Sequence, residues 1–308
     1  MNIAIIDYPE SQKSAVFGLH EMFTLTNEIC AERQLPINIQ TDVIGSIQAT
    51  ELARAYTKYT AIILPPSLGK TYYRNPEASL KDWLIKQHDQ GSILCSACAG
   101  SFILAATGLL NDREATTHWK MEEDFEMQHP KVKLNVNKIL LNDNDVITAG
   151  GMLSWLDLGL ELVAQFTRPN IMRQLGKILI VDTGRREQRF YKQFSPKLMH
   201  GDKVVLNIQK TLQKNFDQSL KISELATIAC LTERTFLRRF SKATGVTPSQ
   251  YIQQLRTQKA SDLLENTQSN IELIANSVGY DDVSAFRKIF VKITGLTPRE
   301  FRKRFTKN

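Results

Sequence analysis

The C-terminal part of the chain repeats one pattern, and this internal repeat constrains the fold more than any other feature of the sequence. Eight positions of the first copy recur in the second. The first copy has Ile222, Leu225, Ala226, Phe236, Phe240, Gly245, Thr247 and Pro248, and the second has, in the same order, Ile271, Ile274, Ala275, Phe286, Phe290, Gly295, Thr297 and Pro298. The offset is 49 residues before a central turn and 50 after it, so the second copy has one extra residue in this turn. Repeats of this kind are structural units that stack to bury their apolar faces.

Each copy predicts two helices joined by a tight turn. In the first copy, Ser223 is expected to cap the first helix and Thr232 the second. Gly245 is expected to end the second helix, and the pair Thr247-Pro248 is typical of the start of another helix. The second copy follows the same plan, with its turn at residues 279–281 and Asp282 placed to cap.

The second helix of each copy has an apolar face and a basic face. Phe236 and Phe240 lie four residues apart, so they share one face and point to a core, and Phe286 and Phe290 repeat this spacing. A helix-turn-helix motif places the N-terminal part of its second helix against base edges in the major groove. The alternative is a pair of ordinary helical hairpins with solvated arginines. Two copies in register, both with a basic second helix, favour DNA binding.

Positive charge is concentrated in the same region. Residues 197–308 contain 19 Lys and Arg against 10 Asp and Glu, a net charge of +9, whereas residues 1–196 contain 20 against 22, a net charge of −2. A positive surface neutralises the phosphates of a nucleic acid backbone. A membrane is a poorer partner, because the sequence has no basic amphipathic helix with a Trp, Phe and Leu face.

From about residue 200 to 306 the chain resembles the AraC/XylS family of transcription regulators. The matching residues are Ile271-Glu272-Leu273-Ile274-Ala275-Asn276-Ser277-Val278-Gly279-Tyr280, followed by Phe286, Phe290, Gly295, Thr297, Pro298, Phe301 and Arg302. The resemblance implies two helix-turn-helix units joined by a long helix, here residues 248–264. The two recognition helices would then enter successive major grooves one helical turn (~34 Å) apart.

The resemblance also implies which side chains face the DNA. They are Arg234, Leu237 and Arg238 in the first copy, with Arg239 beside them, and Val283, Ser284 and Lys288 in the second, with Arg287 beside them. An arginine can pair with guanine O6 and N7 for about 1–3 kcal/mol of discrimination, whereas Leu237 and Val283 would contact a thymine methyl. The implied partners are a double-stranded DNA operator and, for an activator, RNA polymerase.

Length and composition are those of a two-domain cytoplasmic protein. The chain has 308 residues, 42% of them hydrophobic, with no run of 18 apolar residues and no signal-peptide pattern at its N-terminus. Its four cysteines, Cys30, Cys95, Cys98 and Cys230, are too few and too scattered for a disulfide framework. We therefore expect free thiols, a cytoplasmic location and no membrane partner.

Short apolar runs alternate with helical stretches in the first two-thirds of the chain. The apolar runs are 2–7, 61–65, 92–95, 138–141 and 146–149, and the helical stretches include one with Val16, Leu19, Met22, Phe23 and Ile29 on its inner side, 78–90 and 101–107. This alternation predicts an α/β fold with a mainly parallel, doubly wound sheet, followed by the all-α double helix-turn-helix. Ligands of such sheets bind beyond the carboxyl ends of the strands.

One of these strand ends carries a turn similar to a nucleophile elbow. The strand that ends at Cys95 leads into Ser96-Ala97-Cys98-Ala99-Gly100-Ser101 and then a helix, with Cys98 at the apex among small residues. The N–H groups at the start of that helix would favour a thiolate or a bound anion. His118 follows 20 residues later.

Residues from about 1 to 167 are similar to the class I glutamine amidotransferase-like superfamily, in particular to its PfpI-like branch. The matching stretches are 96–110, 115–119, 148–152 and 157–160. The resemblance implies an architecture of transcription regulators in which this domain precedes an AraC-type tail, and residues 185–190 are similar to the connector of such proteins. Two departures argue against catalysis. Ala15 stands where active members have an acid, and residues 65–69 replace their glycine pair.

Three roles are open for Cys98. It could be a nucleophile with His118 as its base, it could line a ligand pocket, or it could be a small buried hydrophobe. The ligand-pocket role makes Cys98, Ala99, His118 and Gly151 the candidate residues. Cys95 and Cys98 have no partner pair for zinc, although a disulfide switch is a further alternative. The other histidines lack metal-ligand spacing and residues 142–145 fit a polar hairpin turn, so no metal and no cofactor is expected.

The sequence thus predicts an amidotransferase-like domain over 1–167, a linker over 168–200 and a DNA-binding domain over 201–308. The linker is expected to fold partly against both domains. Its helix through Ile171, Leu175, Ile178 and Leu179 could carry a homodimer contact. We expect a sequence-specific transcription regulator, not an enzyme, whose first domain senses a small-molecule effector or mediates dimerisation. The alternative is a cysteine-dependent hydrolase or amidase with autoregulatory DNA binding.

Overall fold

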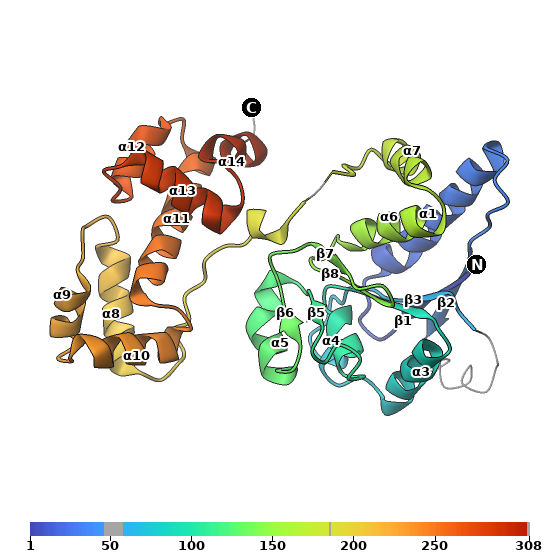
Figure 1. The fold of residues 1–308 in the computed structure, drawn as a ribbon, viewed down its shortest axis with the longest axis horizontal. Helices are drawn as coiled ribbons and strands as arrows, with labels where there is room; N and C mark the ends of the chain where they lie inside the picture. Colours follow the sequence, from blue (N-terminus) through green and yellow to red (C-terminus); the bar gives the residue numbers. More distant parts are fainter. Residues whose placement is uncertain (46–57, 185, 307–308) are drawn as a thin grey trace. The chain divides into compact units, whose positions relative to one another are not determined.

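The chain forms two compact units, Met1–Gln188 and Arg189–Asn308. The computed structural model describes residues 1–45, 58–184 and 186–306 (Figure 1). The first unit is a layered α/β structure and the second is entirely helical, which confirms the predicted fold classes. Within the described ranges, no helix combines the length and the apolar character needed to cross a bilayer.

The first unit is built on a sheet of strand order β2-β1-β3-β4-β8-β7. Its strands are β1 (Asn2–Asp7), β2 (Gln40–Gly45), β3 (Ala61–Leu64), β4 (Ile93–Ala97), β7 (Leu140–Asn142) and β8 (Val146–Ala149). Neighbouring strands are parallel except β7, which runs antiparallel to β8. A separate parallel pair joins β5 (Glu114–Ala115) to β6 (Lys133–Leu134).

Helices cover both faces of this sheet (Figure 1). On one face lie α1 (Lys13–Glu32), α6 (Trp155–Phe166) and α7 (Pro169–Leu179), and on the other α3 (Ala78–Asp89), α4 (Gly100–Ala105) and α5 (Glu122–Gln128). Because side chains alternate along a strand, Ile3 and Ile5 enter the core under α1, whereas Ala4 and Ile6 enter the opposite core. The continuous apolar runs of the sequence are therefore strands buried on both faces. Short 3₁₀ turns occur at Tyr72–Arg74, Trp119–Met121 and Gln188–Phe190.

The stretch predicted as a linker is divided between the two units. Its first part forms α7, whose Ile171 and Leu175 are fully buried in the core of the first unit. These two residues therefore pack inside the first unit, whereas Ile178 on the same helix is 52% exposed. The predicted connector belongs to the first unit as far as Gln188, and Arg185 lies outside the described residues.

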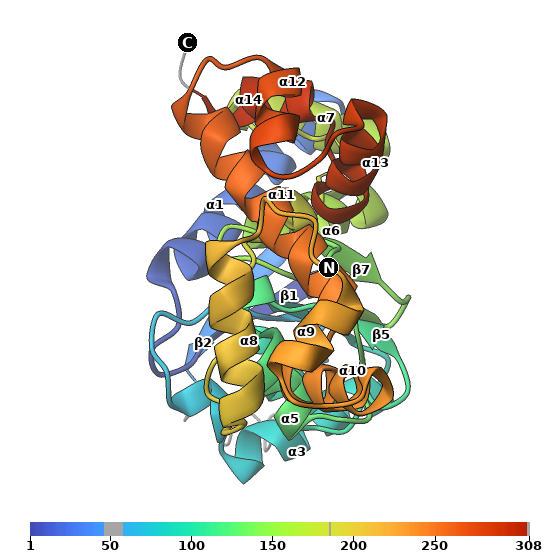
Figure 2. The same ribbon diagram turned by 90° about the vertical axis from the view of Figure 1, so that its left-hand side faces the viewer.

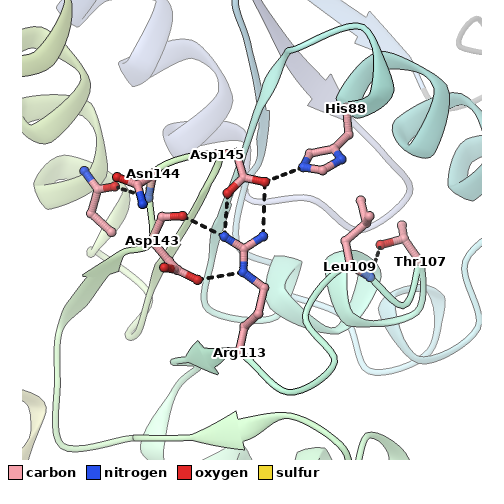
Figure 3. A network of polar contacts seen from close by, with 8 residues as sticks. His88, Thr107, Leu109, Arg113, Asp143, Asn144 and Asp145 are labelled. Atoms are coloured by element: carbon pink, nitrogen blue, oxygen red, sulfur yellow. Dashed lines mark hydrogen bonds and ion pairs between the residues drawn. The ribbon is translucent and has the colours of Figure 1, made fainter.

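A cluster of charged side chains fastens the β7–β8 turn (Figure 3). The Nε of Arg113 donates to Asp143 over 2.6 Å, and its two Nη atoms donate to the two carboxylate oxygens of Asp145. His88 Nε2 lies 2.7 Å from Asp145 Oδ2. The Arg113 guanidinium holds the pKa of Asp145 well below its usual range. Residues 142–145 form a hairpin turn between the antiparallel strands β7 and β8, as predicted. A search of the described residues finds no cluster of three or more His, Cys, Asp or Glu side chains that could hold a metal ion.

The second unit consists of two helix-turn-helix motifs that share a long helix. Its helices are α8 (Lys203–Lys214), α9 (Ile222–Ile228), α10 (Glu233–Thr244), α11 (Pro248–Asn266), α12 (Ile271–Ser277), α13 (Val283–Thr294) and α14 (Pro298–Phe305). Helix α11 runs through both motifs (Figure 2). Its Tyr251 and Leu255 pack in a first core with Phe240, and its Ala260 and Leu264 pack in a second core that contains Phe290.

The ends of the second helix of each motif match the repeat. Thr232 caps α10 and Asp282 caps α13, each side chain accepting a hydrogen bond from a backbone N–H of the first turn. Gly245 and Gly295 end these helices in the left-handed conformation. The capping residues predicted for both second helices are thus confirmed.

The predicted cap at Ser223 is wrong by two positions. Helix α9 begins at Ile222, with Lys221 in the capping position. The Glu224 carboxylate accepts a hydrogen bond from the Lys221 backbone N–H over 3.1 Å. The acidic side chain in the first turn thus holds the start of the helix, and Ser223 already lies inside it.

Candidate functional site

The second helix of each motif presents a polar surface opposite its buried phenylalanines. The predicted DNA-facing residues that are exposed are Arg234, Leu237 and Arg238 on α10 and Ser284, Arg287 and Lys288 on α13. All of them lie in the first half of their helix, the part that enters the major groove in a helix-turn-helix motif. Each motif therefore offers solvent-accessible positive side chains, and Arg238 and Lys288 occupy equivalent positions of the repeat.

Two predicted DNA-facing residues are less exposed than the others because they contact other parts of the second unit. Arg239 turns towards the start of α8, where its Nε and Nη2 lie 2.5 and 3.0 Å from the carboxylate oxygens of Asp202. This pair lowers the pKa of Asp202, which also caps α8. Val283 is half-buried and packs against the second core. Arg239 thus has a role in joining α10 to α8, and Val283 offers less surface than its neighbours.

The sharp turn predicted at Cys98 is present between β4 and α4. Cys98 adopts a φ of +52°, a left-handed conformation that is uncommon for a residue with a side chain. Its N–H donates to the Ala149 carbonyl over 2.8 Å, and its own carbonyl accepts from Thr117 Oγ1 over 2.7 Å. The turn is therefore held from both sides, by the end of β8 and by the segment after β5.

The thiol at this turn lies below the surface. Cys98 is 3% exposed, and burial raises the pKa of its thiol to about 12. Burial also lowers the pKa of His118, whose Nδ1 accepts a hydrogen bond from the Lys120 N–H over 3.0 Å. In the described part of the chain, no hydrogen bond joins the Cys98 thiol to the His118 ring. A cysteine nucleophile works as a thiolate with a base in contact with it. Neither the raised pKa of the Cys98 thiol nor the hydrogen bond between His118 Nδ1 and the Lys120 N–H indicates that arrangement among the described residues.

Cys98 is expected to react slowly with a thiol reagent and Cys230 quickly. The thiolate is the reactive form, so a pKa of about 12 together with burial keeps alkylation of Cys98 slow between about pH 7 and pH 9. Cys230 is exposed and serves as the internal control. Iodoacetamide labelling of the native chain, followed by peptide mass spectrometry, measures both rates. Equal rates at the two cysteines would contradict the buried, protonated thiol.

The four candidate pocket residues gather at the carboxyl edge of the sheet, but they differ in access. Cys98 and Ala99 are buried, whereas His118 and Gly151 are partly exposed. A cleft of about 430 Å³ lies elsewhere on the unit, and none of the four lines it. Its lining comes from β7, α6, α7 and the connector and includes Lys138, Leu140, Asp157, Met172 and Arg186.

The structure adds a residue to this edge that the sequence did not single out. Gln188 is 3% exposed, and its Nε2 donates to the Thr117 carbonyl, the Lys138 carbonyl and Thr116 Oγ1 over 2.8, 2.9 and 3.1 Å. Its Oε1 accepts from the Trp119 N–H over 3.2 Å. Three of these four polar contacts are made to residues 116–119, the segment whose Thr117 also holds the Cys98 turn.

Gly150 makes room for this glutamine. A Cβ at position 150 would lie 1.9 Å from Gln188 Nε2 and 2.6 Å from the Thr117 carbonyl oxygen. The absence of a side chain at Gly150, just after β8, therefore leaves the space that the Gln188 amide of the connector occupies. Both residues lie in stretches that match known families, but no local pattern pairs them, because the partners of Gln188 are 50 to 72 residues away.

Comparison with known proteins agrees with this two-part organisation. A model of the DJ-1/PfpI family matches residues 38–165, and a helix-turn-helix domain model matches residues 225–304. Both resemblances drawn from the sequence are thereby confirmed.

Among curated proteins, the chain is similar to two regulators of Pseudomonas aeruginosa. It is 28% identical to the HTH-type transcriptional regulator ArgR over 215 residues, which cover 69% of this chain and 64% of ArgR. It is 26% identical to the HTH-type transcriptional regulator CdhR over 213 residues, which cover 69% of this chain and 63% of CdhR. The matches thus span slightly less than two-thirds of the length of these relatives.

One solved structure supports the fold of the first unit. A protein from Vibrio parahaemolyticus, provisionally described as a transcriptional regulator protein, superposes with a TM-score of 0.52 at 18% identity. The superposition covers 58% of this chain and 98% of that protein.

Proposed function

We propose that this chain, an AraC-type helix-turn-helix protein with an N-terminal DJ-1/PfpI-like domain, is a sequence-specific DNA-binding transcription regulator. The observation that carries the proposal is the pair of exposed basic helices, α10 and α13, at equivalent places in two linked motifs. The net charge of +9 over residues 197–308 fits a partner with a phosphate backbone. The names of ArgR and CdhR fit the same function.

Replacing Arg238 by alanine is expected to weaken binding to the operator by about ten- to a hundredfold, because an arginine paired with guanine contributes about 1–3 kcal/mol of discrimination. The operator is first selected from a pool of random duplexes with the full chain. Fluorescence anisotropy then gives the dissociation constants for the operator and for bulk competitor DNA.

Lys86→Ala is the matched control, since it removes the same charge from an exposed position of α3 in the first unit. Its affinity is expected to remain that of the wild type. Unchanged affinity and base preference in Arg238→Ala would show that α10 does not read the DNA at this position.

The first unit is proposed to sense a small molecule or to mediate homodimer formation. Support for sensing comes from Gln188, which ties the connector to the Thr116–Thr117 segment beside the Cys98 turn. A ligand that alters this segment would therefore act on the residue that precedes the second unit. A thermal-shift screen of metabolites tests whether the first unit binds a small molecule. Operator affinity is then measured with and without each hit, which tests separately whether that binding is coupled to DNA binding.

The first unit is further proposed to act without cysteine catalysis. Two observations support this proposal: the raised pKa of the Cys98 thiol, and the hydrogen bond that the His118 ring accepts from a backbone N–H. Cys98→Ala is then expected to retain operator binding and the effector response. Loss of a measurable amidase activity in this variant would instead support the hydrolase alternative.

A further inference from the structure

We propose that Arg256 is a positioning residue that fixes the two helix-turn-helix motifs relative to each other and thereby sets the operator spacing that the chain accepts. The proposal rests on the proposed DNA-binding function. The contacts that carry it, however, all lie within the second unit.

Arg256 stands at the middle of α11 and its guanidinium holds three backbone carbonyls. Its Nε donates to the Phe216 carbonyl over 2.7 Å and its Nη2 to the Gln218 carbonyl over 2.9 Å. Both acceptors belong to the loop between α8 and α9, in the first motif. Its Nη1 donates to the Gly279 carbonyl over 2.6 Å, in the turn between α12 and α13 of the second motif. One side chain therefore joins both motifs.

Two further observations place the same loop and turn in direct contact. A Cβ at Gly279, where φ is +85°, would lie 2.4 Å from the Asp217 carbonyl oxygen and 2.8 Å from Arg256 Cζ. Phe216 packs against the cores of both motifs. The guanidinium also lies 5.2 Å from the centroid of the Tyr280 ring, close enough for a cation–π contact. The junction is therefore packed as well as hydrogen bonded.

The chemistry of this junction requires arginine. Its rigid planar fork can donate to three carbonyls in fixed directions, whereas a lysine carries a single ammonium on a flexible stem. Because the guanidinium is used inside the protein, its positive charge serves the junction and is not directed to a phosphate. Without the fork, α11 alone would have to hold the two motifs in register.

The consequence for DNA binding concerns spacing. Helices α10 and α13 read two groove segments that are separated by about one helical turn (~34 Å) in a rigid reader. A fixed junction penalises an operator whose halves are moved apart, since both helices cannot then reach their bases. A loosened junction tolerates altered spacing, but it binds the native spacing less well because the motifs must be ordered on binding.

The test compares the wild type, Arg256→Lys and Lys259→Ala, with the last as a matched control on an exposed position of α11. Each full-length protein is titrated with the selected operator and with versions that gain or lose one or two base pairs between the halves. Arg256→Lys is expected to lose at least about tenfold in affinity for the native spacing and to discriminate less between spacings. Its salt dependence is expected to match that of the wild type, because the lysine keeps the positive charge. Lys259→Ala should keep the spacing preference of the wild type.

Two results would overturn the positioning role. One is wild-type affinity and spacing preference in Arg256→Lys. The other is an equal loss of affinity at every spacing, which would mean that Arg256 supports DNA binding without setting the distance between the two motifs. If Arg256→Lys loses its helical circular dichroism, Phe216→Leu replaces it, since it trims the side chain that packs against both cores.

A readout without DNA separates this inference from the proposed function. If the wild type prefers no DNA sequence, the proposed function fails, but the junction is still testable by amide hydrogen exchange in the α12–α13 turn. Faster exchange in Arg256→Lys than in Lys259→Ala supports the junction, and equal exchange overturns it.

Discussion

Replacing Phe240 by alanine is expected to lower the free energy of unfolding of the second unit by about 3–5 kcal/mol. Phe240 is fully buried, and its ring packs edge-to-face against Phe236 and Tyr251. Truncation removes these contacts and leaves a cavity that the surrounding helices can fill only in part. Phe290→Ala is expected to have an effect of similar size in the other core, where the side chain is equally buried.

The two units can be followed separately in this experiment. All three tryptophans, Trp83, Trp119 and Trp155, belong to the first unit. During urea unfolding, tryptophan fluorescence therefore reports the first unit, whereas circular dichroism also reports the helices of the second. Phe240→Ala is expected to shift the unfolding transition seen by circular dichroism and to leave the transition seen by tryptophan fluorescence unchanged. Phe17→Ala, at a side chain that is 52% exposed, should change stability by less than about 0.5 kcal/mol.

A change below about 1 kcal/mol in Phe240→Ala would contradict the tight packing of the first core. A displaced tryptophan transition would contradict the division of the chain into two separately packed units. Operator binding by Phe240→Ala is expected to fail at temperatures where the helical signal has been lost, because α10 is no longer held on its core.

The repeat made the second unit predictable to the level of single capping residues. Phenylalanines four residues apart fix the buried face, and Thr232, Asp282, Gly245 and Gly295 fix the ends, all through interactions within one or two helical turns. Ser223 was misassigned because Glu224, a first-turn acid, determines where α9 begins.

The first unit was predictable for a different reason. Strands buried on both faces appear as continuous apolar runs, so their existence and the parallel sheet can be inferred from the sequence. The turn at Cys98 was also predictable, because small residues between a strand and a helix leave room for a sharp turn. The burial of the thiol was not, since it depends on elements from elsewhere in the sheet.

The residues that sequence patterns could not interpret are those with distant partners. Arg239 has the position of a DNA-facing arginine, yet its carboxylate partner Asp202 lies 37 residues away. Arg256 contacts carbonyls 40 and 23 residues away, and backbone acceptors leave no mark in a sequence. The hydrogen-bond partners of Gln188 are likewise distant in the sequence. Long-range polar contacts therefore decide which of many similar side chains face solvent and which hold the fold.

Replacing Gly150 by alanine is expected to displace the Gln188 amide from its slot and to destabilise the first unit by about 3 kcal/mol or more, because buried polar groups that lose their partners cost about 1–3 kcal/mol each. The new Cβ would lie 1.9 Å from Gln188 Nε2. It would also lie 2.6 Å from the Thr117 carbonyl oxygen, a backbone atom that cannot swing aside. Unfolding in urea followed by tryptophan fluorescence measures the change.

A double-mutant cycle identifies the cause of this loss. If the clash with Gln188 dominates, Gly150→Ala will cost clearly less in a Gln188→Ala background than in the wild type, with a coupling of about 0.5–3 kcal/mol. Additive costs would instead mean that Gly150 is needed for the Thr117 backbone alone, and that the glutamine is incidental to the fit. The coupled outcome carries a functional consequence, since the same two variants would release the connector from the Cys98 turn. Operator affinity in both variants should then no longer respond to an effector that still stabilises the first unit against heat.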